Sequence, residues 1–245
     1  MVDSHVLIPK LIFKNFHNER QELFYYDFEN EEIKKGHAKT LYTQMGYYSD
    51  YVEDFLGKRI ESPLGSVVKH IANTDFQSCE GLPKDYEETI YRYVYSLVSR
   101  APGMVDAINK NSVFFQLLSE RDRHDIAAHD GLMWSIEKKW LKDYKIGFLV
   151  NNTSERFVLP TRGAVQVGGM LLCPISPYRA FVLEKDFECD NVDENINIVP
   201  VYEIDSTEAV VYINSQAFEQ ERKGDKKYVV ATSPQELEKL VENMK

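Results

Sequence analysis

The fold is decided by residues 145–183, which read KIGFLVNNTSERFVLPTRGAVQVGGMLLCPISPYRAFVL. Short runs rich in Val, Ile, Leu and Phe are separated here by Asn, Gly, Pro or charged residues, which is the pattern of consecutive short β-strands. Short strands that follow one another closely favour an antiparallel sheet. The strands that we predict are 145–150, 156–159, 164–167, 169–173 and 178–183, with two more at 196–202 and 228–231.

Before residue 145 the apolar residues recur mostly at helical spacing. Ser49 is a candidate N-cap for a helix that runs to His70, either as one helix or as two joined near Pro63. Residues 85–99 form the clearest helical pattern, which ends because Pro102 disfavours a helical conformation in the residue before it. The other predicted elements are a short helix at 9–16, a strand at 21–28, and helices at 124–142, 206–221 and 233–243.

These patterns predict a single α+β domain over residues 1–245, helix-rich in 1–144 and strand-rich in 145–245. The helical N-terminal half is expected to pack on a mainly antiparallel sheet from the C-terminal half, with C-terminal helices completing the fold. The chain has 43% hydrophobic and 12% aromatic residues, which is enough for a substantial core. It shows no internal repeat and no long linker.

The sequence also excludes several classes of protein. No stretch approaches the roughly 18 consecutive apolar residues of a membrane helix, and the start MVDSH lacks the layout of a signal peptide. Cys79, Cys173 and Cys189 are far apart and odd in number, so we expect free thiols in a soluble, cytoplasmic protein. No nucleotide, zinc-protease, hydrolase or calcium motif occurs, so we predict neither a cofactor nor a metal ion.

The densest polar cluster is residues 120–130, which read ERDRHDIAAHD and contain two His-Asp pairs five residues apart. Five residues are about 500° of helix, so His124 and His129 point about 140° apart and would not share a metal ion. His129 falls on the apolar face of the predicted helix. A buried, hydrogen-bonded core histidine is the favoured interpretation of His129, and a role in a pocket is the alternative.

Four widely spaced segments carry a resemblance to a known family. They read SHVLIPKLIFKNF at 4–16, VEDFL at 52–56 with IE at 60–61, NNT at 151–153 with FV at 157–158, and CPISP at 173–177. In order and approximate spacing they resemble the family catalogued as domain of unknown function 4238. The resemblance implies a fold and a pocket but no settled activity. By analogy, it implies a microbial, phage or mobile-element protein with an accessory or defence-related role.

The resemblance also implies a set of candidate site residues. The family's helix with paired glutamates matches Glu53 and Glu61. Its arginine before a proline matches Arg100, and its histidine before the central strand matches His129. A carboxylate, a guanidinium and an imidazole brought together could transfer protons or hold an anionic substrate. A buried ion pair between Glu61 and Arg100 that fixes helix register is an equally weighted alternative.

The central motif of the family is altered in this chain. Where the family has Ser-Asp-Asn-Pro, residues 159–163 read LPTRG, so Thr161 replaces the acidic residue and Arg162 replaces the asparagine. A shifted alignment would place Asn151 and Asn152 on the motif instead. Arg162, Asn151 and Asn152 are therefore candidate substrate contacts.

Two functional hypotheses follow from these candidates. The first is a binding or interaction protein with a groove between the helical half and the sheet, for which another protein is a candidate partner. The tyrosines between residues 42 and 51 suit such contacts, although they could equally cover the core. The alternative is a hydrolase directed at a phosphoester, in the manner of a nuclease. In it Glu61 and His129 are the acid and base, and Arg100 or Arg162 binds the anion.

The net charge of -10 generates a prediction about nucleic acids. With 29 basic against 39 acidic residues, the surface lacks the counterion release that drives nonspecific duplex binding. At physiological salt we expect no measurable binding to random duplex DNA in a gel-shift assay. Sub-micromolar, sequence-independent binding would reveal a concentrated basic groove and contradict this expectation.

Overall fold

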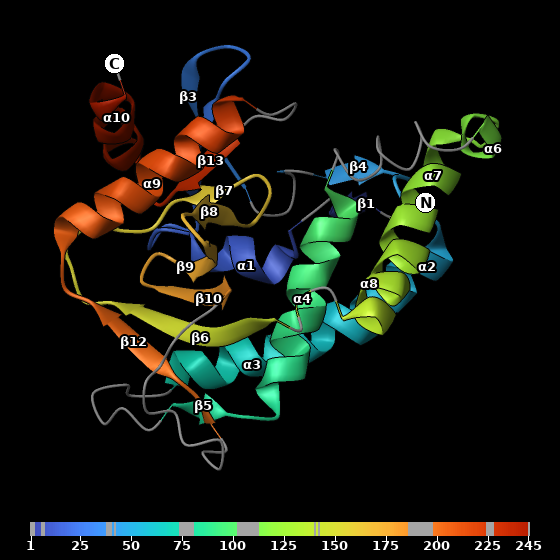
Figure 1. Ribbon diagram of the computed structural model, residues 1–245. Helices are drawn as coiled ribbons and strands as arrows, with labels where there is room; N and C mark the ends of the chain where they lie inside the picture. Colours follow the sequence, from blue (N-terminus) through green and yellow to red (C-terminus); the bar gives the residue numbers. More distant parts are fainter. Residues whose placement is uncertain are drawn as a thin grey trace.

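The structure is a computed structural model that describes residues 3–5, 8–37, 41, 43–73, 81–101, 113–139, 141, 143–185, 198–223 and 228–244. It combines helices with mainly antiparallel sheets, so the predicted α+β class is confirmed (Figure 1). Within the described ranges, every helix is too short or too polar to cross a membrane.

The largest sheet has five strands in the order β12-β6-β10-β9-β8. Every neighbouring pair is antiparallel except β12 and β6. The strand predictions at 145–150, 164–167, 169–173 and 178–183 are therefore confirmed. The bounds are β6 Tyr144–Asn151, β8 Val165–Val167, β9 Met170–Ser176, β10 Arg179–Lys185 and β12 Val201–Ile204.

The paired strands β6 and β10 bury side chains on both faces of this sheet. Phe148 and Phe181 lie opposite each other and enter the core shared with the N-terminal helices, whereas Leu149 and Ala180 enter the core shared with α9. Figure 1 shows α9 on one side of the sheet and α3 on the other. Burial on both faces explains the nearly continuous apolar runs in the sequence. The covering helices are α1 Lys10–Asn15, α3 Ser62–Asn73, α4 Tyr86–Arg100 and α9 Thr207–Arg222.

A second, four-stranded sheet joins the two ends of the chain. Its order is β3-β2-β13-β7, all antiparallel, and α10 packs against it. The predicted strands at 21–28 and 228–231 are confirmed as β2 and β13. The bounds are β2 Leu23–Asp27, β3 Glu32–Gly36, β7 Leu159–Pro160, β13 Tyr228–Ala231 and α10 Pro234–Asn243.

The division into a helix-rich and a strand-rich half is only partial. Besides β2 and β3, three short strands lie before residue 145: β1 (Asp3–His5), β4 (Thr43–Met45) and β5 (Leu82–Pro83). The sequence analysis missed β3 because it is an edge strand, in which lysines replace the alternating apolar pattern.

Two helical segments of the N-terminal half have the same construction. Each begins with a serine cap, since Ser49 accepts a hydrogen bond from the Val52 amide and Ser119 accepts one from the Asp122 amide. Each then continues through seven α-helical residues, five π-helical residues and a further α-helix, and both π-helical parts contact α4. The bounds are α2 Asp50–Leu56, η1 Gly57–Glu61, α7 Glu120–Ile126, η3 Ala127–Gly131 and α8 Leu132–Lys138, with a short α6 at Val113–Gln116.

These helices differ from the predictions in two places. Of the two alternatives predicted for residues 49–70, one continuous helical segment is observed, but it contains the π turn η1, which ends at Glu61 and widens the helix just before Pro63. A wider turn relieves the collision of a proline ring with the carbonyl four residues earlier. The helix predicted at 124–142 begins earlier, at Glu120, and ends at Lys138. Residues 140 and 142 lie outside the described residues.

Two strand predictions in the C-terminal half are wrong in extent. The predicted strand 156–159 is strand only at Leu159–Pro160, because side chains rather than a neighbouring strand hold the backbone before it. The predicted strand 196–202 is divided at Pro200 into β11 (Ile198–Val199), which pairs with β5, and β12. Proline has no amide hydrogen to donate to a sheet, so it suits the point where the chain changes sheets.

Near its C-terminal end, α9 buries a carboxylate. Glu221 is 1% exposed, and its Oε1 accepts a hydrogen bond of 3.2 Å from the Arg162 amide. Within the described residues its Oε2 has no hydrogen-bond partner. Burial raises the pKa of Glu221 to about 7, against the opposing effects of Arg162 and Thr161. The hydrogen bond from the Arg162 amide therefore fixes the turn after β7, although burial of the ionised Glu221 carboxylate is unfavourable.

This burial predicts how stability depends on pH. The folded pKa of about 7 lies above the unfolded value of about 4.3, so between these values the folded state keeps a proton that the unfolded state loses. Stability contributed by this group therefore falls as the pH rises from about 4 to about 7. We expect the free energy of unfolding, measured in urea, to fall less between pH 5 and pH 8 for Glu221→Gln than for wild type. The two decreases should differ by on the order of 3 kcal/mol.

The matched control is Glu238→Gln, because Glu238 is an exposed residue of α10. It should keep the pH dependence of the wild-type chain. If the stability of Glu221→Gln depended on pH as that of wild type does, the Glu221 carboxylate would not titrate between its unfolded and its folded pKa.

Candidate functional site

Arg100, the last residue of α4, is buried as predicted. It is 3% exposed, and its guanidinium donates hydrogen bonds from Nε to the Ser96 carbonyl at 3.1 Å and from Nη2 to the Ser96 hydroxyl at 3.2 Å. It also makes a side-chain hydrogen bond with the buried Tyr48. Among the described residues these partners are neutral, and no carboxylate lies within ion-pair distance of Arg100.

Glu61 and Glu53 lie in the electrostatic surroundings of Arg100. Burial raises the pKa of Glu61, the charge of Arg100 lowers it, and the charge of Glu53 raises it further. Glu61 is the last residue of the π turn η1. Three of the residues singled out by the family resemblance therefore come together, without forming a direct ion pair.

His129 has a different set of partners. Its Nδ1 lies 2.6 Å from Asp130 Oδ1 and its Nε2 lies 3.2 Å from the Tyr51 hydroxyl. Its ring packs on Phe55 at 4.5 Å between centroids, and the side chain is 25% exposed, so it is less buried than expected of a core histidine. Neither hydrogen bond of His129 is to Glu61. The structure thus groups Glu61 with Arg100, and His129 with Tyr51 and Asp130.

The candidate substrate contacts Asn151, Asn152 and Arg162 all make hydrogen bonds within the protein. Asn151 is buried, donates to the Glu155 carbonyl at 2.7 Å and accepts from the Thr153 amide at 2.9 Å. Asn152 donates to carboxylates of β12 and the residue after it, and the amide of Arg162 donates to Glu221. None of the three lines the groove described next.

A groove of about 750 Å³ is lined by residues that no sequence pattern connects. It lies between α1, the end of α3, the turn from β9 to β10, and the start of α10. Apolar side chains form much of its wall, and three arginines, Arg20, Arg156 and Arg179, line it. The apolar residues are Phe24, Val68, Ile71, Ala72, Ile175 and Pro177.

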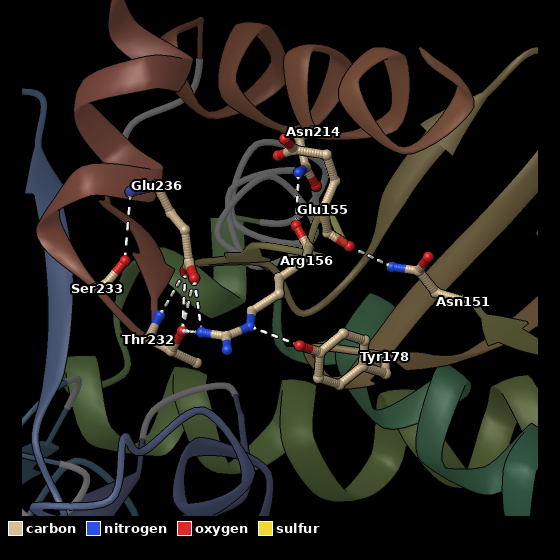
Figure 2. Close-up of polar contacts among 8 residues, drawn as sticks. All are labelled: Asn151, Glu155, Arg156, Tyr178, Asn214, Thr232, Ser233 and Glu236. Atoms are coloured by element: carbon tan, nitrogen blue, oxygen red, sulfur yellow. Dashed lines mark hydrogen bonds and ion pairs between the residues drawn. The ribbon is translucent and has the colours of Figure 1, made fainter. Parts of the chain in front are cut away.

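Arg156 is the best-anchored cation of the groove (Figure 2). Its Nε donates to the Tyr178 hydroxyl at 2.8 Å, and its Nη1 donates to Thr232 Oγ1 at 2.7 Å and to Glu236 Oε1 at 2.9 Å. The Tyr178 contact and Glu236 raise the pKa of Arg156. Its second terminal nitrogen, Nη2, has no hydrogen-bond partner in the part of the chain that the structure describes.

The backbone that carries Arg156 is held by side chains on both sides. Asn214 of α9 donates to the Arg156 carbonyl at 2.7 Å, and Asn151 donates to the preceding carbonyl, that of Glu155 (Figure 2). Asn214 also accepts from the Val158 amide at 3.1 Å. The Phe157 amide donates to the Pro177 carbonyl at 2.8 Å. The segment has no regular secondary structure, but hydrogen bonds to two of its carbonyls and two of its amides anchor it on both sides of Arg156.

Glu236 has a double role at the start of α10. Its amide donates to Ser233 Oγ, as in a capping box, and its carboxylate accepts from the amide of Thr232, the residue before the N-cap, at 3.0 Å. The same carboxylate binds Arg156. Ser233 caps α10 and Pro234 stands at the first helical position, so the Ser-Pro-Gln-Glu pattern is the sequence signal that could have identified Glu236.

Other contacts fix the opposite wall of the groove. Arg179 donates to the Ile71 carbonyl and is half-buried, which lowers its pKa. Asn15 donates to the Ile175 carbonyl at 2.8 Å. His17 also lines the groove, and its Nε2 is buried without a hydrogen-bond partner in the described part of the chain. Burial, with smaller effects of His37 and Lys14, lowers the pKa of His17.

Three of the four segments quoted from the sequence border this groove. Asn15 belongs to the first, Arg156 lies between the two parts of the third, and Ile175, Ser176 and Pro177 belong to the fourth. Among the described residues, no group of three or more His, Cys, Asp or Glu side chains is placed to hold a metal ion. Cys173 is a buried free thiol whose pKa is raised to about 12 by burial, and Cys79 and Cys189 lie outside the described residues.

Comparisons of the chain with family models, with curated proteins and with solved structures find no match. The function is therefore argued from the geometry and chemistry of the groove and of the cluster around Arg100.

The burial of Arg100 predicts its contribution to stability. Arg100→Ala removes the guanidinium contacts with Ser96 and Tyr48 and leaves a cavity, so we expect a loss of about 2–3 kcal/mol in the free energy of unfolding. For a chain of this size that corresponds to a Tm lower by about 4–10 °C in calorimetry. Arg59→Ala, at an exposed position of η1, should melt within about 1 °C of wild type. Equal Tm values for Arg100→Ala and wild type would contradict the stabilising role of the Arg100 contacts.

Proposed function

We propose that the protein is a ligand-binding or interaction protein that holds an anionic ligand in the groove between its helical half and its sheets. The observation that carries the proposal is Arg156. Three of its contacts, to Tyr178, Thr232 and Glu236, fix the guanidinium, and its Nη2 remains available. A guanidinium held in this way can bind an anion without first losing side-chain freedom.

The groove has the composition of a small-molecule site. Its volume of about 750 Å³ lies within the usual range of roughly 300–1,000 Å³ for ligand pockets. Such pockets combine apolar walls with a few fixed polar groups, and here the apolar side chains surround the three arginines. The rigid backbone on either side of Arg156 supplies the pre-organisation that a specific site needs.

The location of the protein in the cell and its biological role are proposed from Cys173 and from the family resemblance. A cytoplasmic location is supported by the free thiol of Cys173, since reduced cysteines are the norm in that compartment. An accessory or defence-related role in a microbe, phage or mobile element rests on the family resemblance.

The second candidate function is hydrolysis at the cluster around Arg100. It is favoured by the raised pKa of Glu61 in a π turn beside a buried guanidinium, because perturbed carboxyls and π turns are both frequent at active sites. In this scheme Glu61 is the acid, Arg100 binds the anion, and His129 must turn away from Asp130 and Tyr51 to serve as base. Groove binding is the simpler proposal, since it requires no such rearrangement.

A thermal-shift screen tests groove binding. The probes are organic phosphates, nucleoside monophosphates, aliphatic and aromatic carboxylates, and short acidic peptides. We expect at least one probe class to raise the Tm of wild type by more than about 2 °C, which corresponds to ligand well above its Kd. Arg156→Gln should abolish that shift, because it removes the free cationic donor.

The matched control is Arg222→Gln, since Arg222 is an exposed arginine of α9 that contacts only Glu219 among the described residues and does not line the groove. It should retain the full shift. The proposal is wrong if no probe shifts the wild-type Tm, or if Arg156→Gln responds as wild type does.

A further inference from the structure

We infer that Tyr51 is a nucleophile that takes up an acyl group from an activated, uncharged acyl donor such as an aryl ester or a thioester. In this site His129 is the general base and Asp130 is a positioning residue. The inference goes beyond the proposed function, because none of these three residues lines the groove. The hydrogen bonds among the three side chains, the contacts that hold them and the charges beside them support it.

The three side chains form a chain of hydrogen bonds, which we call the triad. His129 Nδ1 lies 2.6 Å from Asp130 Oδ1, and His129 Nε2 lies 3.2 Å from the Tyr51 hydroxyl. An ionised carboxylate can only accept hydrogen bonds, so it holds the proton of the neutral imidazole on Nδ1. Nε2 then accepts from the Tyr51 hydroxyl. A nucleophile bonded to a base that a third group orients is the arrangement that activates weak nucleophiles in enzymes.

The other His-Asp pair of residues 120–130 braces the helices that carry the triad. The His124 ring stacks on Tyr47 at 3.9 Å between centroids, and Asp125 accepts a hydrogen bond of 2.9 Å from the Ser49 amide, at the cap of α2. Phe55 packs on the triad imidazole, and α2 contacts η3 (Figure 1). These contacts hold the nucleophile and its base in place before a substrate binds.

Tyr51 is accessible, whereas its base is partly covered. Tyr51 is 68% exposed, and the side chain of His129 is 25% exposed. An acyl donor can therefore reach the Tyr51 oxygen from solvent. The base is carried by the π turn η3, and π turns are frequent at functional sites. The hydroxyl thus has a base within hydrogen-bond reach and an open line of approach, which a nucleophile requires.

The charges beside the triad favour acyl transfer over phosphoryl transfer. Neither α2 nor η3 contains a lysine or an arginine, and their acids are Asp50, Glu53, Asp54 and Asp130. Lys58 of the adjoining η1 is paired with Asp54 at 2.7 Å. A phosphoryl donor carries negative charge and needs cations at the reacting group, whereas an ester carbonyl is uncharged. The donor that suits this surface is therefore uncharged.

The transfer balances with these groups alone. As Tyr51 Oη attacks the carbonyl carbon, His129 Nε2 takes the hydroxyl proton, and Asp130 stabilises the imidazolium that forms. The bond from the carbonyl carbon to the aryl oxygen or thioester sulfur then breaks, and His129 returns the proton to the departing atom. The products are an acyl ester of Tyr51 and a phenol or thiol. Since a phenolate leaves more readily than an alkoxide, water activated by His129 can release the carboxylic acid and restore Tyr51.

Reaction with p-nitrophenyl acetate tests the inference. In wild type quenched with acid, we expect release of p-nitrophenol together with one acetyl group on Tyr51, located by tandem mass spectrometry. Tyr51→Phe should lose the adduct, slow the release at least about tenfold and melt within about 1 °C of wild type, because the side chain is exposed. The matched control is Tyr212→Phe, at an exposed position of α9, which should react as wild type does.

Two more positions separate catalysis from structural support. His129→Gln should slow acetylation of Tyr51 about a hundredfold or more, since it removes the base. Asp130→Asn should slow it at least about tenfold, and Asp130→Glu should recover most of the rate, because a carboxylate again orients the imidazole. Asp54→Asn is the control, since Asp54 is an exposed acid outside the triad, and it should leave the rate unchanged. Equal rates for Asp130→Asn and wild type would overturn the positioning role.

The donor class is tested with p-nitrophenyl valerate, the p-nitrophenyl monoester of glutarate, and p-nitrophenyl phosphate. The two esters have acyl chains of equal length, and only the glutarate monoester is an anion. We expect the valerate to acylate Tyr51 about tenfold faster than the glutarate monoester, and the phosphate to leave Tyr51 unmodified. Faster reaction of either anion would overturn the uncharged donor.

The remaining outcomes also decide the inference. Acetyl groups on lysines but not on Tyr51, or equal release by wild type and Tyr51→Phe, would overturn Tyr51 as the nucleophile. Release that depends on His129 without an acetyl group on Tyr51 would make the imidazole a base toward water and would overturn it too. Arg156→Gln should acetylate Tyr51 at the wild-type rate, so this site and the groove stand or fall separately.

Discussion

Side chains of the paired strands β6 and β10 enter two separate cores, and this two-sided burial constrains every other element. One face requires α9, whose Val210, Ala217 and Phe218 complete that core, and the other requires the N-terminal helices. Within the sheet, Gly147 of β6 makes room for the Tyr202 ring of the neighbouring strand β12, because a Cβ there would lie 2.4 Å from that ring. The two covering layers must therefore meet around the edges of the sheet. The groove forms at one such edge, where α3, the β9–β10 turn and the start of α10 come together.

The irregular segment before β7 exists because buried backbone must be satisfied even where no strand is available. Asn151 and Asn214 provide the donors and acceptors that a neighbouring strand would otherwise give. Both asparagines are largely buried, so their amides are committed to the backbone. This arrangement places Arg156 on a loop with the rigidity of a regular element. A loop of this kind can carry a binding residue without a large entropic cost on association.

Local sequence patterns were sufficient to predict elements whose contacts are close in sequence or whose hydrophobic periodicity is strong. The cap at Ser49 and the antiparallel strands of the large sheet followed from neighbouring residues. The pairing of β2 with β13 could not be predicted, because about two hundred residues separate the two strands and a short apolar run does not specify its partner. The π turns were also missed, since they depend on packing against α4.

The residues of the candidate sites also differ in whether the sequence alone could identify them. Glu61 and Arg100 were candidates through the family resemblance, and the structure places Glu61 within the electrostatic influence of Arg100. The groove was expected between the helical half and the sheet, but its residues come from segments around 15, 71, 156, 177 and 233 that share no sequence period. Arg156 in particular lies in a segment that was interpreted as a strand, where alternate residues would face solvent. Only the three-dimensional meeting of Asn214, Tyr178 and Glu236 distinguishes it from a surface arginine.

The two arginines at the centre of these arguments represent opposite solutions to placing a guanidinium inside a fold. Arg100 is buried among neutral acceptors, so its charge is opposed only by more distant carboxylates, which costs stability unless something else requires the charge there. Arg156 is 40% exposed in its side chain and paired with Glu236, so its charge costs little and its free edge stays accessible. Ligand binding needs a cation that is fixed but reachable, and only Arg156 meets both conditions. The buried charge at Arg100 is then best understood as serving the cluster of Glu53 and Glu61, where it moderates the burial-induced rise in the pKa of Glu61.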